Sequence, residues 1–99
     1  MKKLLLLSAL IVSVSSIGQT ADEYFELGLL KIENLEDYQG AIADYTKAIE
    51  IDPDYVAAYV NRGVSKENLG DLVGACADWN KAAALGDTEA AQWVANQCN

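Results

Sequence analysis

Residues 37–48, DYQGAIADYTKA, return 34 positions later as residues 71–82, DLVGACADWNKA. Among the positions that repeat are an acidic residue, a glycine, an alanine, a second acidic residue, an aromatic residue, a lysine and an alanine: Asp37/Asp71, Gly40/Gly74, Ala41/Ala75, Asp44/Asp78, Tyr45/Trp79, Lys47/Lys81 and Ala48/Ala82. A fixed period of this length predicts structural units that stack on one another.

Upstream of this stretch the same repeat continues with an offset of 35: Tyr24 with Tyr59, Gly28 with Gly63, and Lys31 with Lys66. One inserted residue accounts for the change of offset, and Ile32 is the best candidate. No window alternates apolar and polar residues with a period of two, so the sequence predicts helices only. Asp37 and Asp71 precede apolar runs and are expected to cap the helices that follow, and Asp54 is expected to cap another.

The period and its residues resemble the tetratricopeptide repeat family, in which each unit pairs two antiparallel helices. The resemblance covers nearly everything after Thr20. It implies an all-α fold, a short right-handed solenoid with unit one at about 21–55, unit two at about 56–89 and a capping helix at about 88–98. The positions that would pack the repeats are Tyr24, Gly28, Tyr38, Ala41, Tyr45, Ala48, Pro53, Tyr59, Gly63, Ala75, Trp79, Ala82 and Trp93.

Three positions depart from the family pattern: the insertion near Ile32, Asp87 in place of a proline, and Gln97 in place of a third glycine. The last two suggest that the final segment is a cap. Gly28 and Gly63 would lie in the middle of helices, where glycine costs about 1 kcal/mol relative to alanine. We expect them because they let the partner helix approach closely.

The first 18 residues have the layout of a secretory signal peptide. Met1-Lys2-Lys3 is basic, Leu4 to Ile17 is apolar, and small residues precede acidic sequence. We expect cleavage after Gly18, with Ser16 as the alternative, and export to a periplasm or to the exterior. The apolar run is short for a transmembrane span, although an uncleaved anchor is the competing interpretation.

Without Lys2 and Lys3, five basic residues stand against fifteen acidic ones, a formal charge of −10. Such a surface repels phosphate backbones and anionic membranes, so neither nucleic acid nor a membrane is an expected partner. The acid excess is explained either by solubility or by a basic protein partner.

Cys76 and Cys98 are the only cysteines, and in an exported chain they are expected to be oxidised. Each lies 11 residues from a turn centred near Asp87, so antiparallel helices would bring them to the same height. The sequence favours a disulfide, and two buried free thiols are the alternative.

By resemblance, the first helices of the two units line a groove that holds a peptide or a partner helix. Asn61 occupies the place of an asparagine that bonds the ligand backbone in the family, and Asp22 and Glu67 would edge the groove. The complete groove set is Phe25, Glu26, Leu29, Val60, Asn61, Val64 and Asn68. The apolar members could equally be core residues of the repeats. Phe25 and Leu29 stand where lysines and asparagines would grip a terminal carboxylate, so that clamp is not expected.

No catalytic constellation is found in the sequence. Histidine is absent, Ser65 is the only serine after the signal, and the glycines are scattered singly. We therefore expect no enzymatic activity, no cofactor and no metal. The sequence favours a module that binds another protein or peptide, with a self-associating homodimer that completes its own solenoid as the alternative.

Overall fold

The computed structural model describes residues 19–99, which form five α-helices and no strand. The helices are α2 (Ala21–Leu35), α3 (Tyr38–Ile51), α4 (Val56–Asn68), α5 (Leu72–Ala84) and α6 (Thr88–Gln97). The predicted signal peptide, residues 1–18, lies outside the described residues.

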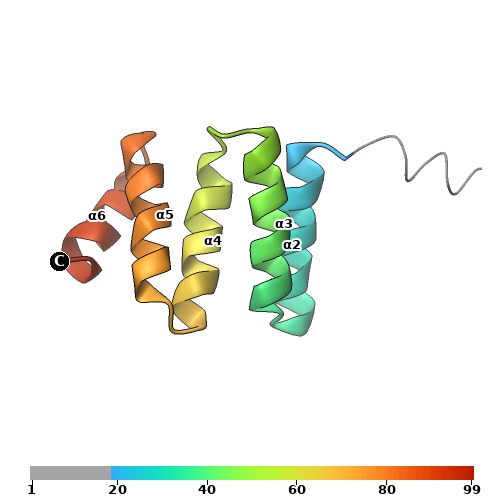
Figure 1. Ribbon diagram of the computed structural model, residues 1–99, viewed down its shortest axis with the longest axis horizontal. Helices are drawn as coiled ribbons and strands as arrows, with labels where there is room; N and C mark the ends of the chain where they lie inside the picture. The colour runs from blue at the N-terminus through green and yellow to red at the C-terminus, as the bar shows by residue number, and fades with distance from the viewer. Residues whose placement is uncertain (1–18) are drawn as a thin grey trace, which may run out of the picture.

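Each helix packs against the next one along the chain, α2 on α3, α3 on α4, α4 on α5 and α5 on α6. Short connections alternate between the bottom and the top of the row of helices, so neighbouring helices run antiparallel (Figure 1). The all-α class is therefore confirmed, and the helical pairs stack as an α-solenoid. None of the five helices within residues 19–99 has the length and apolar character of a membrane span.

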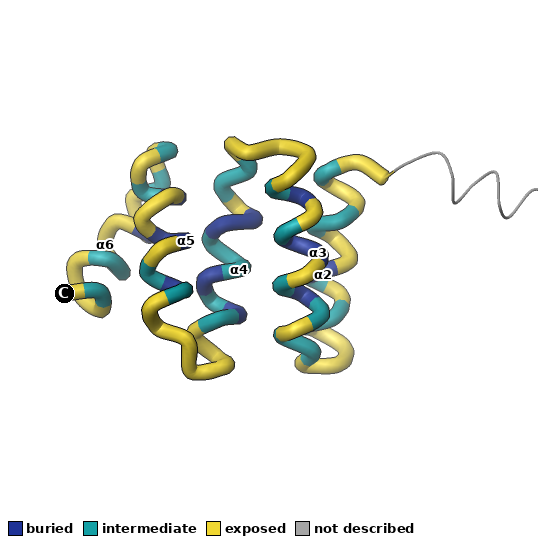
Figure 2. The backbone as a smooth tube through the Cα atoms, in the orientation of Figure 1, coloured by how far each residue is buried: buried dark blue, intermediate teal, exposed yellow. Residues whose placement is uncertain are grey.

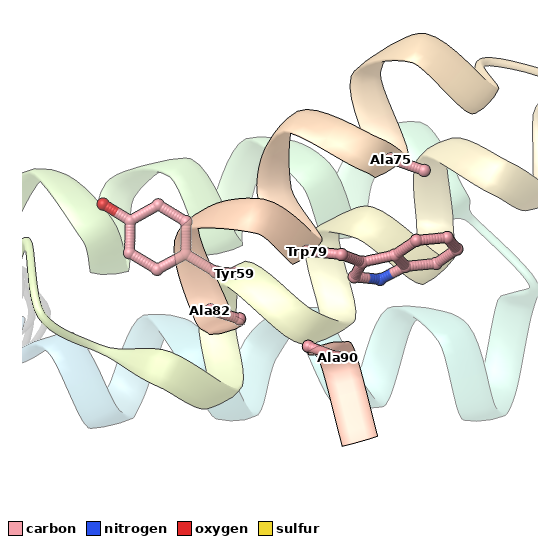
Figure 3. Packing of buried hydrophobic residues seen from close by; sticks show 5 residues of the cluster. All are labelled: Tyr59, Ala75, Trp79, Ala82 and Ala90. Carbon is pink, nitrogen blue, oxygen red and sulfur yellow. The ribbon is translucent and has the colours of Figure 1, made fainter. Parts of the chain in front are cut away.

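Two buried clusters repeat along the stack (Figure 2). The first contains Ala41, Tyr45, Ala48 and Ala58, and the second contains Tyr59, Ala75, Trp79, Ala82 and Ala90 (Figure 3). Alanines make up most of both clusters because the helices lie close together around the large aromatic rings. A Cβ atom at Gly28 would lie 2.5 Å from Tyr45 Cε1, and one at Gly63 would lie 2.5 Å from Trp79 Nε1. The two mid-helix glycines thus make room for the two rings.

The remaining predicted packing residues are less buried. Tyr24 packs against the first cluster and Trp93 against the second, and Tyr38 is half-buried. Pro53 is exposed in the connection between α3 and α4, where its carbonyl accepts a hydrogen bond from Tyr59 Oη at 2.9 Å.

Aspartates begin three of the helices. The carboxylates of Asp37, Asp71 and Asp87 accept hydrogen bonds from backbone N–H groups three residues on, at 2.8 to 2.9 Å. The prediction for Asp54 is wrong. Helix α4 begins after Tyr55 without a side-chain cap, and the Asp54 backbone N–H instead donates to Asp52 Oδ1 at 3.1 Å. The hydrogen bond between Asp54 and Asp52 closes the turn around Pro53. Tyr55, and not Asp54, is therefore the residue that precedes α4.

The inserted residue is absorbed at the C-terminal end of α2, which has 15 residues, whereas the equivalent helix α4 has 13. The Asp37 N–H donates to the Lys31 carbonyl at 3.0 Å, and the equivalent Asp71 N–H donates to the Lys66 carbonyl at 2.8 Å. The two hydrogen bonds join equivalent residues, but the segment that they enclose, which includes the end of the helix, is one residue longer in the first unit. The left-handed position is held by Gly70 in the second turn, at φ 86°, and by Glu36 in the first, at φ 49°.

A disulfide joins Cys76 of α5 to Cys98 at the end of α6, with Cα atoms 5.7 Å apart, as the spacing predicted. Within residues 19–99 no free cysteine remains. The rings of Trp79 and Trp93 pack with centroids 5.2 Å apart, and Ala90 is fully buried. Helix α6 therefore covers the α5 side of the second cluster.

Candidate functional site

A pocket opens between the first helices of the two units, over the ring of Tyr45. Its volume is about 220 Å³, and it is lined by Leu29, Ile32 and Glu33 of α2, Tyr45 of α3, and Asn61 and Val64 of α4. Leu29 and Val64 occupy equivalent positions in the repeat. Ile32 lies one helical turn from Leu29 on α2, and Asn61 lies one helical turn from Val64 on α4. The pocket walls formed by the two helices therefore combine apolar surface with a polar edge.

The Tyr45 hydroxyl is the unusual group in this pocket. The Tyr45 side chain is buried, and its oxygen has no hydrogen-bond partner among the described residues. Burial raises the pKa of Tyr45 to about 12. The Asn61 amide acts in the opposite direction on that pKa but makes no hydrogen bond of normal geometry to the hydroxyl. Buried polar groups are almost always paired, so an unpaired one at a pocket points to a missing partner.

The equivalent residue in unit two differs in this respect. Trp79 occupies the place of Tyr45, and its Nε1–H donates to the Val60 carbonyl at 3.3 Å. The indole nitrogen is therefore satisfied inside the fold, whereas the phenol oxygen is not.

The structure brings together three of the seven predicted groove residues, Leu29, Asn61 and Val64. Phe25 instead packs between aromatic rings, with centroids 5.2 Å from Tyr55 and 5.6 Å from Tyr45. The side chain of Val60 packs against the second buried cluster.

The polar members of the predicted groove are also dispersed. Asn68 Nδ2 donates to the Val64 carbonyl at 2.9 Å, so it lies folded along its own helix. Glu26 lines a different pocket, on the outer side of α2. At the groove edge, Asp22 accepts a 2.6 Å hydrogen bond from Tyr55 Oη, and Glu67 is exposed. Burial, followed by the nearby Asp22, raises the pKa of Tyr55 to about 12.

Ile32, Glu33 and Tyr45 line the pocket although the sequence did not place them there. Tyr45 was recognised only as a packing residue. The sequence did contain one signal for this role of Tyr45: unit one has a tyrosine where unit two has a tryptophan. A phenol has an oxygen at the tip of the ring, and that oxygen must find a hydrogen-bond partner.

Ion pairs occupy most of the basic side chains. Asp78 accepts from Arg62 Nε at 2.9 Å and Nη2 at 2.6 Å and lies 3.0 Å from Lys66 Nζ. The hydrogen bonds to Asp78 raise the pKa of Arg62 above its ordinary value, against the effect of burial. In unit one, Asp44 pairs with Lys31 alone, at 2.8 Å.

Because these ion pairs use most of the basic side chains, the charges that remain on the surface are mainly negative. Among the described residues no group of three or more cysteine, aspartate or glutamate side chains is placed to hold a metal ion.

Residues 34–70 match a family described as TPR repeat. A search of curated proteins finds no match for the chain. The matched span runs from the end of α2 through α3 and α4, which includes the contact between the two units. Repeats of this kind typically bind other proteins or peptides. The match over residues 34–70, the period of 34 residues and the stacked helical hairpins together support a protein of the tetratricopeptide repeat family.

Proposed function

We propose that the pocket between α2 and α4 binds a segment of another protein, and that the protein is a non-catalytic interaction module. The observation that carries the proposal is the buried Tyr45 hydroxyl, which has no hydrogen-bond partner among residues 19–99 although it borders an open pocket. An unpaired buried hydroxyl costs about 1–3 kcal/mol, a penalty that a hydrogen-bond acceptor would relieve if its binding moves the pocket wall far enough to reach the oxygen.

The chemistry of the walls defines the segment. The Tyr45 hydroxyl and the Asn61 amide both offer a donor, so they suit a backbone carbonyl of a peptide. Leu29, Ile32 and Val64 suit a small apolar side chain next to that carbonyl, whose burial contributes about 1.5–3 kcal/mol. The ligand is therefore a peptide segment with an apolar residue at its centre.

The absence of catalysis is part of the same proposal. Ser65, the one serine among residues 19–99, is fully buried, and its hydroxyl donates to the Asn61 carbonyl at 2.9 Å. It is therefore shielded from a substrate and is not paired with a base.

We further propose that the protein works outside the cytoplasm, after loss of residues 1–18. The Cys76–Cys98 disulfide supports this location, because such bridges persist in oxidising compartments. The charge of −10 on the remaining chain supports a basic rather than an acidic partner.

Tyr45→Phe tests the pocket. Peptides selected from a random library against residues 19–99 would be measured by titration calorimetry against the parent and this variant. We expect affinity to fall by about tenfold, because the carbonyl loses its donor in a desolvated site. The free energy of unfolding should change by less than about 0.5 kcal/mol or rise, since no internal hydrogen bond is removed.

Tyr59→Phe is the matched control. Its hydroxyl donates to Pro53, away from the pocket. This change should lower stability by about 1 kcal/mol and leave the affinity unchanged. The proposal fails if Tyr45→Phe binds the selected peptides as well as the parent does, or if both variants lose affinity equally.

A further inference from the structure

The outer side of α2 is a helix face that nothing covers within residues 19–99. Glu23, Leu27 and Leu30 lie on this face, which we call the end face. They are the repeat equivalents, at an offset of 35, of Ala58, Arg62 and Ser65 on α4. On α4 these positions contact the preceding unit, and Ala58 and Ser65 are fully buried.

On α2 the same positions are open to solvent. Leu27 is 36% exposed and Leu30 is 50% exposed. With Gln19, Asp22, Glu23 and Glu26 they line a shallow pocket of about 420 Å³. Two leucines at spacing three on one helix face form an apolar strip, and it lies at the repeat positions where α4 contacts the preceding helix.

The surroundings of the strip are acidic. Asp22, Glu23 and Glu26 border it, and no basic residue lines the pocket. Lys31, on the same helix, is held by Asp44 at 2.8 Å. Glu23 also stands where α4 has the buried Ala58. A helix that docks there as α3 docks on α4 would have to meet this carboxylate with a positive charge, because an unpaired buried charge is strongly unfavourable.

We propose that the end face binds an amphipathic helix of another protein, one that carries lysine or arginine beside its apolar stripe. The bound helix takes the place that α3 takes on α4 and adds one more layer to the solenoid. Its apolar stripe covers Leu27 and Leu30, and its cations reach Glu23 and Glu26. This surface is separate from the Tyr45 pocket, so the two sites can be tested independently.

A second copy of this chain is a poorer occupant. The described residues carry ten more acidic than basic side chains, and Arg62, Lys66 and Lys31 are used in internal ion pairs. Joining two such surfaces would bring like charges together. A basic helix removes that repulsion.

The test uses residues 19–99, which supply all the residues of both buried clusters. The probe is a synthetic helical peptide of 14 residues, the length of α3, with leucines spaced three and four apart and lysines beside them. A second peptide has glutamate in place of every lysine. Backbone amide shifts are followed by NMR during titration. We expect the lysine peptide to perturb Leu27 and Leu30, with affinity that falls as salt is raised.

Leu27→Ser with Leu30→Ser should weaken binding by at least about tenfold. The matched control is Leu69→Ser with Leu72→Ser, since Leu69 and Leu72 are 44% and 42% exposed. Glu23→Gln with Glu26→Gln should weaken binding by about fivefold and flatten the salt dependence. Glutamine at position 23 preserves the hydrogen bond to Thr20 that caps α2.

Equal binding of the glutamate peptide would overturn the proposal, as would equal loss in the Leu69/Leu72 variant or no binding at all. Shifts centred on Asn61 and Val64 would assign the peptide to the Tyr45 pocket instead. A dimer of residues 19–99 that is dissolved by the Leu27/Leu30 change would identify a second copy as the occupant. Circular dichroism of each variant establishes that its helices are intact.

Discussion

The two repeat units differ most in how completely their polar groups are satisfied. In unit two the ring nitrogen of Trp79 donates to Val60, and Asp78 is paired with two cations. In unit one the Tyr45 hydroxyl has no partner among the described residues, and Asp44 is paired with one lysine. Two units that share the repeat positions thus give one hairpin whose polar groups are paired internally and one whose polar groups are open to further contacts.

The units also differ at their ends. Unit two is covered by α6 and fastened by the disulfide, whereas the outer face of α2 carries exposed leucines. Unit two therefore has the more completely covered core, and unit one, together with the edge of α4, carries the surfaces that we propose for contact with other molecules.

The largest expected difference between the units is in their buried carboxylates. Asp78→Ala leaves Arg62 and Lys66 partly buried without an anion and should lower the free energy of unfolding by about 3–5 kcal/mol. Asp44→Ala leaves only Lys31, whose side chain is 37% exposed and can turn to water, so about 1 kcal/mol is expected. Urea denaturation of both variants measures the difference, and equal midpoints would show that the two ion pairs are equivalent.

The disulfide should give the next largest effect. Replacing Cys76 and Cys98 by serine removes a link across a sequence separation of 22 residues, which is worth about 3 kcal/mol on the chain-entropy model. Hydrogen exchange should show that α6 loses protection before α2 does. If α2 lost protection before α6, the disulfide would not be the reason that unit two is the more stable unit.

The smallest effect concerns the two turns. Glu36→Gly should stabilise the protein by up to about 1 kcal/mol, because glycine adopts the left-handed conformation at φ 49° without strain. Gly70→Ala should destabilise by about 1 kcal/mol for the same reason at φ 86°. Thermal denaturation of the two variants checks the direction of each change in stability. A loss of stability in Glu36→Gly would indicate that the glutamate side chain has a role in the turn.

The stack of helices could be predicted from the sequence because the repeat is a local pattern. The sequence predicted that Gly28 and Gly63 lie at close helix contacts, whereas the rings that fill the space beside them, Tyr45 and Trp79, were identified only by the structure. Asp37 and Asp71 could be recognised as caps because an apolar run follows each directly. The prediction that Asp54 caps α4 failed because aspartate is favoured both in turns and at helix caps. Only the backbone path around Pro53 decides which of the two roles it has.

The candidate site was less predictable. Leu29, Asn61 and Val64 were placed by resemblance, whereas Phe25 packs between two aromatic rings, and Val60, like Val64, packs against the second buried cluster. Whether an apolar residue lines a groove or fills a core depends on neighbours that are distant in sequence, such as Tyr55 against Phe25. The unpaired hydroxyl of Tyr45 is likewise a property of the assembled fold.

The turn between α2 and α3 has a practical consequence. Its two ends, Lys31 and Asp37, are held together by a hydrogen bond and reinforced by the cap on Gly40, while the residues between them tolerate a change in number. Leu35 and Glu36 are exposed there. A fluorescent label could therefore be attached at Leu35 or Glu36, at the exposed end of α2, where it would leave the pocket-lining side chains of Ile32 and Glu33 in place.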